Sequence, residues 1–185
     1  MRRGFIFSSM SLEKPAAGSV WRWALRFGVG VGMVCALWLV LLQLTGNNPF
    51  GPKRLLAQFT VPIAVIASQW AFRRSVRPGK PGLGRSLGVG GLTTVLAALI
   101  AATSLYSLGQ SASPEVLRRN RTEMQEIARS EHDYLVKQGG GEAAYQQRLR
   151  QLGQLTVADL AQNDFSKILL LGLMFALPAG VFFRE

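Results

Sequence analysis

FGVGVGMVCALWLVLLQL, the stretch from Phe27 to Leu44, sets the class of protein to which this chain is expected to belong. It has no charged residue, and its one strongly polar side chain is Gln43. A helix rises about 1.5 Å per residue, so this run nearly crosses a hydrocarbon core about 30 Å thick. A helix in a soluble core keeps one polar face, and this run has none. The stretch therefore predicts a transmembrane helix in an integral membrane protein.

Three more apolar runs have the length of membrane spans. The four predicted spans are residues 24–44, 55–72, 87–108 and 165–183. Pro62 and Pro178 fall inside two of them and are expected to bend a helix or free a backbone carbonyl. Apart from Arg26 and Lys167 at the extreme ends, the spans contain no Asp, Glu, Lys, Arg or His. Ionisable groups inside a membrane usually mark ion paths, so this composition disfavours an ion-coupled transporter.

The insert at residues 110–164 has a different composition, rich in both acids and bases. Ser113-Pro114-Glu115 is typical of a helix start, and Gly139-Gly140-Gly141 is expected to end that helix before a second one. Apolar residues recur at helical spacing on both. They are Leu117, Met124 and Leu135 on the first helix, and Tyr145, Leu149 and Leu152 on the second. The predicted fold is all-α: four transmembrane helices, with an extracytoplasmic helical hairpin between the third and fourth that faces a partner.

The net charge of +11 is concentrated beside the membrane. The N-terminal segment, the 73–86 loop and the C-terminus hold 11 basic residues against two acids. Short basic loops face the cytoplasm, so both termini are predicted to be cytoplasmic and the hairpin to face outward. The basic residues of the loop are Arg73, Arg74, Arg77, Lys80 and Arg85. Their expected partner is a bilayer with anionic headgroups, and nucleic-acid binding is not expected.

Small residues predict where the helices pack. Gly172, Ala176 and Gly180 recur every four residues and so share one face of the fourth span. Lipid is as apolar as Leu, so close backbone approach at small residues is what brings helices together. The other predicted packing positions are Gly28, Gly32, Gly84, Gly88, Ala98 and Ala102. They predict association with other membrane subunits or with a second copy of the chain.

No catalytic, cofactor or metal site is expected. His132 is the single histidine, and the positions three and four residues away hold no second ligand. Cys35 is the single cysteine and lies inside the first span, where a small buried apolar role is expected. Gln58 and Gln69 fall near span ends, where they are expected to reach headgroups or cap a neighbouring helix.

The start of the chain predicts an uncleaved signal anchor. The first apolar run is too long for the core of a signal peptide, and no A-x-A cleavage site follows it. Met10 is a candidate alternative start, because residues 1–9 add little to any pattern.

Two stretches resemble a known family. They are Gly84-Arg85-Ser86-Leu87-Gly88-Val89-Gly90, which leads into the third span, and Asp164-Phe165-Ser166-Lys167, from which the chain runs on to Phe183-Arg184. Together with the four spans and the helical insert, they resemble the bacterial membrane proteins of domain-of-unknown-function family 4199, from about residue 22 to the end. The resemblance implies the cytoplasmic membrane of a Gram-negative bacterium. It implies no activity and no catalytic residue.

The function that these patterns favour is that of a non-enzymatic membrane subunit. It would pack through its helices, as an accessory or assembly subunit, and present the hairpin to a partner. A small transporter or channel is the first alternative. A membrane enzyme acting on lipid, dependent on Glu131 or Asp133, is the second.

Overall fold

The computed structural model describes residues 17–138 and 140–184, and in this part of the chain the regular structure is helical throughout. The elements are α1 (Ala17–Leu44), the 3-10 helix η1 (Pro52–Arg54), α2 (Leu55–Gln58), α3 (Thr60–Val76), α4 (Leu83–Ser111), α5 (Pro114–Ser130), α6 (His132–Gln138), α7 (Glu142–Gly153) and α8 (Val157–Phe182). Four stretches are long and apolar enough to cross a membrane: Val20–Leu44, Pro52–Val76, Leu83–Ser111 and Val157–Phe182. The predicted all-α membrane class is confirmed. The candidate start at Met10 lies outside the described residues.

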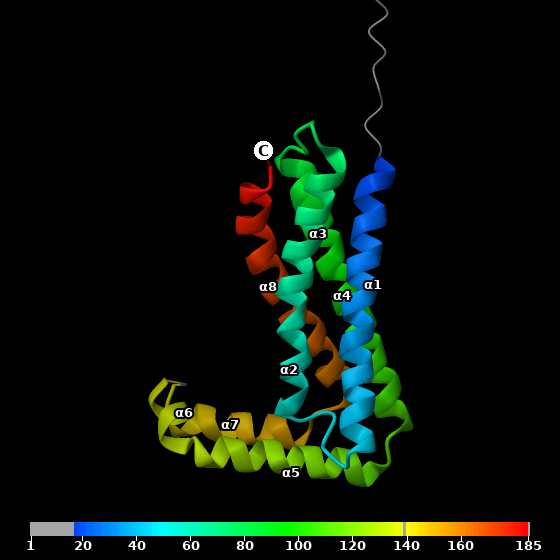
Figure 1. Ribbon diagram of the computed structural model, residues 1–185. Helices are drawn as coiled ribbons and strands as arrows, with labels where there is room; N and C mark the ends of the chain where they lie inside the picture. The colour runs from blue at the N-terminus through cyan, green and yellow to red at the C-terminus, as the bar shows by residue number, and fades with distance from the viewer. Residues whose placement is uncertain (1–16, 139, 185) are drawn as a thin grey trace, which may run out of the picture.

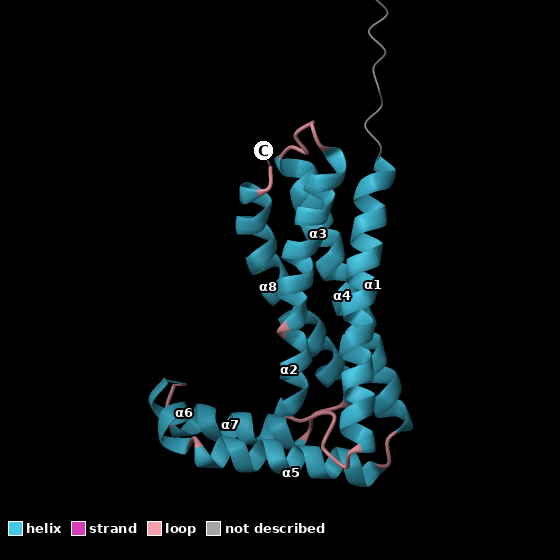
Figure 2. Ribbon diagram, in the orientation of Figure 1, coloured by secondary structure: helices cyan, strands magenta, loops and turns pink. Residues whose placement is uncertain are grey.

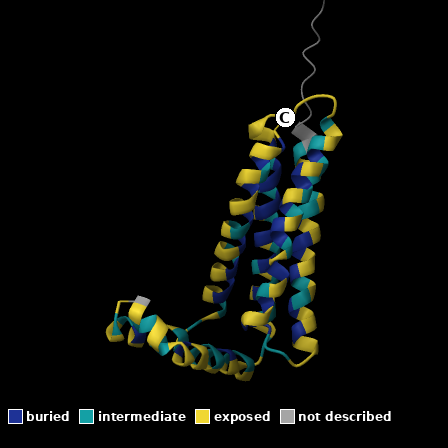
Figure 3. Cartoon of the chain, turned by 60° about the vertical axis from the view of Figure 1, so that its left-hand side comes forward, coloured by how far each residue is buried: buried dark blue, intermediate teal, exposed yellow. Residues whose placement is uncertain are grey.

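The four long stretches form an upright bundle, with α4 packed against α1, α3 and α8 (Figures 1 and 2). Buried residues line the inside of the bundle, and exposed residues line its outside (Figure 3). Large apolar side chains such as Leu37, Ile63 and Leu170 are exposed on the outer face. An apolar exterior of this extent suits contact with lipid tails rather than water.

Each of the four long helical stretches begins before the span predicted from apolar residues alone. The clearest correction is α8, which begins at Val157 and not at residue 165. Thr156 is its N-cap: its hydroxyl accepts from the Asp159 N–H at 3.2 Å, and the Asp159 carboxylate accepts from the Thr156 N–H at 2.9 Å. This reciprocal pair satisfies backbone donors at the helix start, so the polar residues before the apolar run are helical as well. The helices of the insert occupy only residues 114–153.

The second span is interrupted at Phe59, between α2 and α3. Pro62 has no N–H to donate to the carbonyl of Gln58, so one helical hydrogen bond is missing at this point. The interruption agrees with the effect expected of Pro62. It lies inside the second span, in the half nearer the insert (Figure 2).

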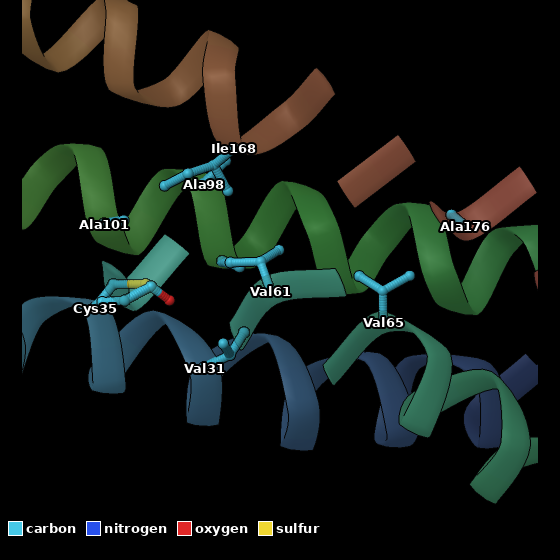
Figure 4. Close-up of a cluster of buried hydrophobic side chains, with 10 residues drawn as sticks. Val31, Cys35, Val61, Val65, Ala98, Ala101, Ile168 and Ala176 are labelled. Carbon is cyan, nitrogen blue, oxygen red and sulfur yellow. The ribbon is translucent and has the colours of Figure 1, made fainter. Parts of the chain in front are cut away.

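The bundle core is built mainly from small and β-branched side chains. Val31 and Cys35 from α1 face Val61 and Val65 from α3, while Ala98 and Ile168 meet on the other side of the cluster (Figure 4). The Cys35 thiol is buried and donates to the Ala57 carbonyl at 3.7 Å. Because these side chains are small, the helix backbones approach closely and gain dispersion contacts.

The insert forms a hairpin of α5, α6 and α7 that lies crosswise at one end of the bundle (Figure 1). α5 packs against α7, as expected for two amphipathic helices. The basic loop between α3 and α4 lies at the opposite end of the bundle, beside the C-terminus (Figure 1). The hairpin helices therefore run across the direction of the bundle axis (Figure 1).

Candidate functional site

The predicted small residues pack largely within this one chain. A Cβ atom added at Gly28 would lie 2.8 Å from Leu96 Cβ, and one at Gly32 would lie 2.8 Å from Ile100 Cβ, so α1 rests on α4 at both positions. On α8, a Cβ at Gly172 would lie 2.3 Å from Thr94 Cγ2. These close approaches place the small faces of α1 and α8 against α4.

The other predicted packing residues differ in their surroundings. Ala98 and Ala176 are buried in the core, and a Cβ at Gly180 would lie 2.4 Å from Leu87 Cδ2. A Cβ at Gly88 would lie 3.8 Å from Val20 Cγ1, which is an ordinary contact. Ala102 is half-buried. Gly84 is exposed, and a Cβ there would meet nothing within 4 Å. Gly84 therefore makes no close helix contact in this fold.

The root of the hairpin is fixed to the turn after α1. The Asn48 side-chain amide donates to Asn120 Oδ1 at 3.0 Å and to Glu123 Oε2 at 2.7 Å. Asn120 is only 1% exposed. Leu117 packs against a buried cluster of Leu39, Phe50, Leu105 and Leu160. The hairpin is thus held to the bundle at one end by both polar and apolar contacts.

Farther along the hairpin, the predicted residues lie between its own helices. Tyr145 is buried, while Met124, Leu135, Leu149 and Leu152 are half-buried. The Gln125 amide donates to the Leu149 carbonyl at 3.2 Å and ties α5 to α7. These apolar residues therefore serve mainly to hold α5, α6 and α7 together.

The predicted basic loop begins in the last turn of α3 and ends in the first turn of α4. Arg73 is half-buried, and Arg74, Arg77, Lys80 and Arg85 are exposed. The Arg74 guanidinium stacks over Trp70 at 4.5 Å from the ring centroid. The loop presents most of its positive charge to the surroundings at the end of the bundle away from the hairpin.

A buried polar cluster joins the second and fourth spans near the hairpin. Arg54 Nε lies 3.2 Å from Asp164 Oδ1, and the two side chains are 7% and 4% exposed. The Gln58 amide donates to the same carboxylate oxygen at 2.6 Å, and Arg54 Nη1 donates to the Phe50 carbonyl at 2.8 Å. A buried charge is tolerated when it is paired and hydrogen-bonded. The carboxylate thus joins α8 to the start of the second span.

A second buried amide joins three helices deeper in the bundle. Gln69 Nε2 donates to the Ser86 carbonyl at 3.1 Å and to the Ala176 carbonyl at 3.0 Å. Gln69 is fully buried. The expectation that Gln58 and Gln69 reach headgroups is therefore wrong, because both face the inside of the bundle. Gln69 does bond neighbouring helices, but its acceptors are the carbonyls of Ser86 and Ala176, which lie inside α4 and α8 and not at a helix end.

Sequence reasoning missed the Arg54–Asp164 pair because it ended the spans at apolar residues. Arg54 lies just before the predicted span at residues 55–72, and Asp164 is the last residue of the predicted insert. The available signal was Thr156-x-x-Asp159, which resembles a capping box and would have extended the last helix through Asp164. On these helices both charged side chains are buried inside the bundle, where each requires a partner of opposite charge.

His132 is held between two carboxylates at the tip of the hairpin. Its Nδ1 lies 3.0 Å from Asp133 Oδ1, and its Nε2 lies 3.1 Å from Glu142 Oε2. Hydrogen bonds to Asp133 and then to Glu142 raise the pKa of His132 above its usual value. Across residues 17–138 and 140–184, no three His, Cys, Asp or Glu side chains are grouped to hold a metal ion.

We expect the raised pKa of His132 to make the fold of the hairpin tip weakly pH-dependent. The stabilisation is complete below the unfolded-state pKa of about 6.5 and is lost as the pH rises through the higher folded-state pKa. NMR titration of the imidazole measures this pKa without ambiguity, because the chain has one histidine. Asp133→Asn and Glu142→Gln should each lower the pKa. An unchanged pKa in both variants would contradict the arrangement.

Comparison with known proteins gives one family. Residues 26–185 match the family described as "Protein of unknown function (DUF4199)". No curated protein and no solved structure gives a significant match to the chain. The matched region includes the hairpin, the Arg54–Asp164 pair and nearly all of the four spans, and it confirms the resemblance seen in the sequence. The chain belongs to the DUF4199 family, whose function is unknown.

Proposed function

We propose that this protein is a non-enzymatic accessory or assembly subunit of a bacterial cytoplasmic membrane, with both termini in the cytoplasm. In this proposal the bundle anchors the hairpin, and the hairpin binds a partner protein at the outer surface of the membrane. One observation supports the proposal above the others: the hairpin is fixed at its root and extends crosswise beyond the bundle (Figure 1).

Beyond the residues that fix its root, the hairpin exposes large apolar side chains. Ile127, near the end of α5, is 39% exposed, and Tyr134, on α6, is 58% exposed. Aromatic and branched apolar groups on an otherwise polar helix surface are common anchors of protein interfaces. Because the root is held by Asn48, Asn120 and Glu123, these two side chains are presented in a fixed direction.

Affinity purification of the full-length protein from native membranes tests this proposal. We expect a defined set of membrane proteins to copurify with the wild type and to be lost from the Tyr134→Glu and Ile127→Glu variants. Thr122→Glu is the matched control, because Thr122 is an exposed polar position of α5. It introduces the same charge and should retain the partners.

Loss of the same proteins from all three variants, or from none, would contradict a partner surface at the hairpin tip. Substrate-dependent flux in vesicles of the purified protein would support the transporter or channel alternative. Lipid turnover that is lost in Glu131 or Asp133 variants would support the enzyme alternative. Either flux or lipid turnover would contradict the proposed role of an accessory or assembly subunit.

The proposed orientation predicts which cysteine variants an impermeant thiol reagent can label. In a Cys35→Ala background, Gln147→Cys on α7 should be labelled in intact spheroplasts. Lys80→Cys, in the exposed basic loop at the opposite end of the bundle, should be labelled only after the membrane is opened. The reverse pattern would place the hairpin in the cytoplasm and contradict the positive-inside assignment.

A further inference from the structure

An apolar groove runs along the outside of the bundle between the second span and α8. Its volume is about 550 Å³, and its lining includes Phe59 on one side and Leu170, Met174 and Leu177 on the other. Lys167 and Gln58 lie at the end nearer the hairpin. The groove is therefore apolar along most of its length and polar at one end.

The groove has the dimensions of one leaflet. Lys167, Leu170, Met174 and Leu177 follow one face of α8, and the helix rises roughly 15 Å from the first to the last. Half of a hydrocarbon core about 30 Å thick has the same depth. The polar end thus falls near the headgroups on the hairpin side, and the apolar part falls among the acyl chains.

Lys167 leaves this end of the groove with an uncompensated positive charge. Asp164 is already paired with Arg54, and Lys167 interacts electrostatically with both at longer range. Within the described part of the chain, the Lys167 ammonium makes no ion pair or hydrogen bond, and its side chain is exposed. Two cations share one carboxylate here, so the cluster has a net charge of +1. A lone cation at this depth requires an anion or the headgroup region.

A second groove on the same bundle differs from the first because it has no cation like Lys167 in its lining. This groove lies between α1 and the second span, has a volume of about 610 Å³, and is lined by residues that include Leu37, Trp38, Leu56 and Thr60. No charged residue lines it. The nearby Lys53 ammonium is bonded to Asn47 Oδ1. Any lipid tail suits this groove, whereas the groove at Lys167 also offers a charge.

We propose that the groove between the second span and α8 binds one anionic glycerophospholipid of the hairpin-side leaflet. Its phosphate contacts Lys167, and one acyl chain lies along Leu170, Met174 and Leu177. The site is distinct from the basic loop at the other end of the bundle, and it does not depend on the partner role of the hairpin.

Native mass spectrometry of the full-length protein tests the site. The protein is purified in mild detergent and given equal amounts of phosphatidylglycerol and phosphatidylcholine with identical acyl chains. We expect the wild type to retain phosphatidylglycerol in preference to phosphatidylcholine. Lys167→Gln should reduce that preference about fivefold, the effect of one Lys beside an anionic surface. Lys167→Arg, which keeps the charge, should retain the preference.

Two controls separate the site from general attraction to negative lipid. Lys53→Gln removes a cation from the same end of the bundle and should leave the preference unchanged. Met174→Trp fills the groove and should lower retention of both lipids. The proposal is overturned if the wild type shows no preference, if Lys167→Gln keeps it, or if Lys53→Gln removes it to the same extent.

Discussion

Replacing Asp164 with Leu is expected to lower the free energy of unfolding by about 3–5 kcal/mol, the usual effect of removing one partner of a buried ion pair. Arg54 would stay buried with only the Phe50 carbonyl as a bonded partner, and the Gln58 amide would lose its acceptor. Unfolding of the purified protein in mixed detergent and SDS micelles, followed by circular dichroism, measures the change.

The double variant Arg54→Leu with Asp164→Leu gives the sharper result. A buried ion pair replaced by apolar residues of similar size is often close to neutral, so the double variant should recover most of the lost stability. Glu115→Leu is the matched control. It breaks the surface ion pair in which the Arg118 side chain is 75% exposed and the Glu115 side chain is 76% exposed. The loss in free energy of unfolding should be less than about 1 kcal/mol. If Asp164→Leu lowers the free energy of unfolding no more than this control does, the buried pair is not required for stability.

Gly172→Leu should have the second large effect, a loss of about 3 kcal/mol or more, or failure to accumulate in the membrane. A Cβ atom at this position would lie 2.3 Å from Thr94 Cγ2. Thr94 cannot turn away easily, since it is fully buried and its hydroxyl donates to the Gly90 carbonyl at 2.9 Å. The larger side chain therefore has to push α8 away from α4. Protein level in the membrane and unfolding in micelles both report this separation.

Leu173→Ala is the control for Gly172→Leu, because Leu173 is the next residue of α8 and is 39% exposed on the outer face. Its effect should be mild. Ala176→Leu, one turn along the packed face, should resemble Gly172→Leu. Equal effects from Gly172→Leu and Leu173→Ala would mean that the small face of α8 has no special role in packing.

The membrane class and the main helices could be predicted because they depend on local properties. An uncharged run such as Phe27–Leu44 satisfies its backbone only as a helix in lipid, whatever surrounds it. The spacing of Gly172, Ala176 and Gly180 likewise shows one face of a helix, but it does not identify the partner. The structure supplies that partner as α4 of the same chain.

The buried polar contacts could not be predicted from local patterns. Gln58 and Asp164 are far apart in sequence, and only the packing of α8 beside the second span brings them within 2.6 Å. Gln69 is equally uninformative alone, because an amide near a span end suits a headgroup as well as a neighbouring carbonyl. The crosswise direction of the hairpin also depends on a distant contact, between Asn48 and Asn120.

The order of the spans along the chain has a consequence for biogenesis. Arg54, Gln58 and Gln69 are synthesised and inserted before α8 provides the Asp164 carboxylate and the Ala176 carbonyl. Until the last span enters the membrane, these side chains face lipid or each other without their final acceptors, at considerable cost in free energy. Arrival of α8 thus completes these buried polar contacts. A chain cut short before residue 164 leaves Arg54 and Gln58 without the Asp164 carboxylate and Gln69 with only the Ser86 carbonyl as acceptor, a defect on which membrane quality control can act.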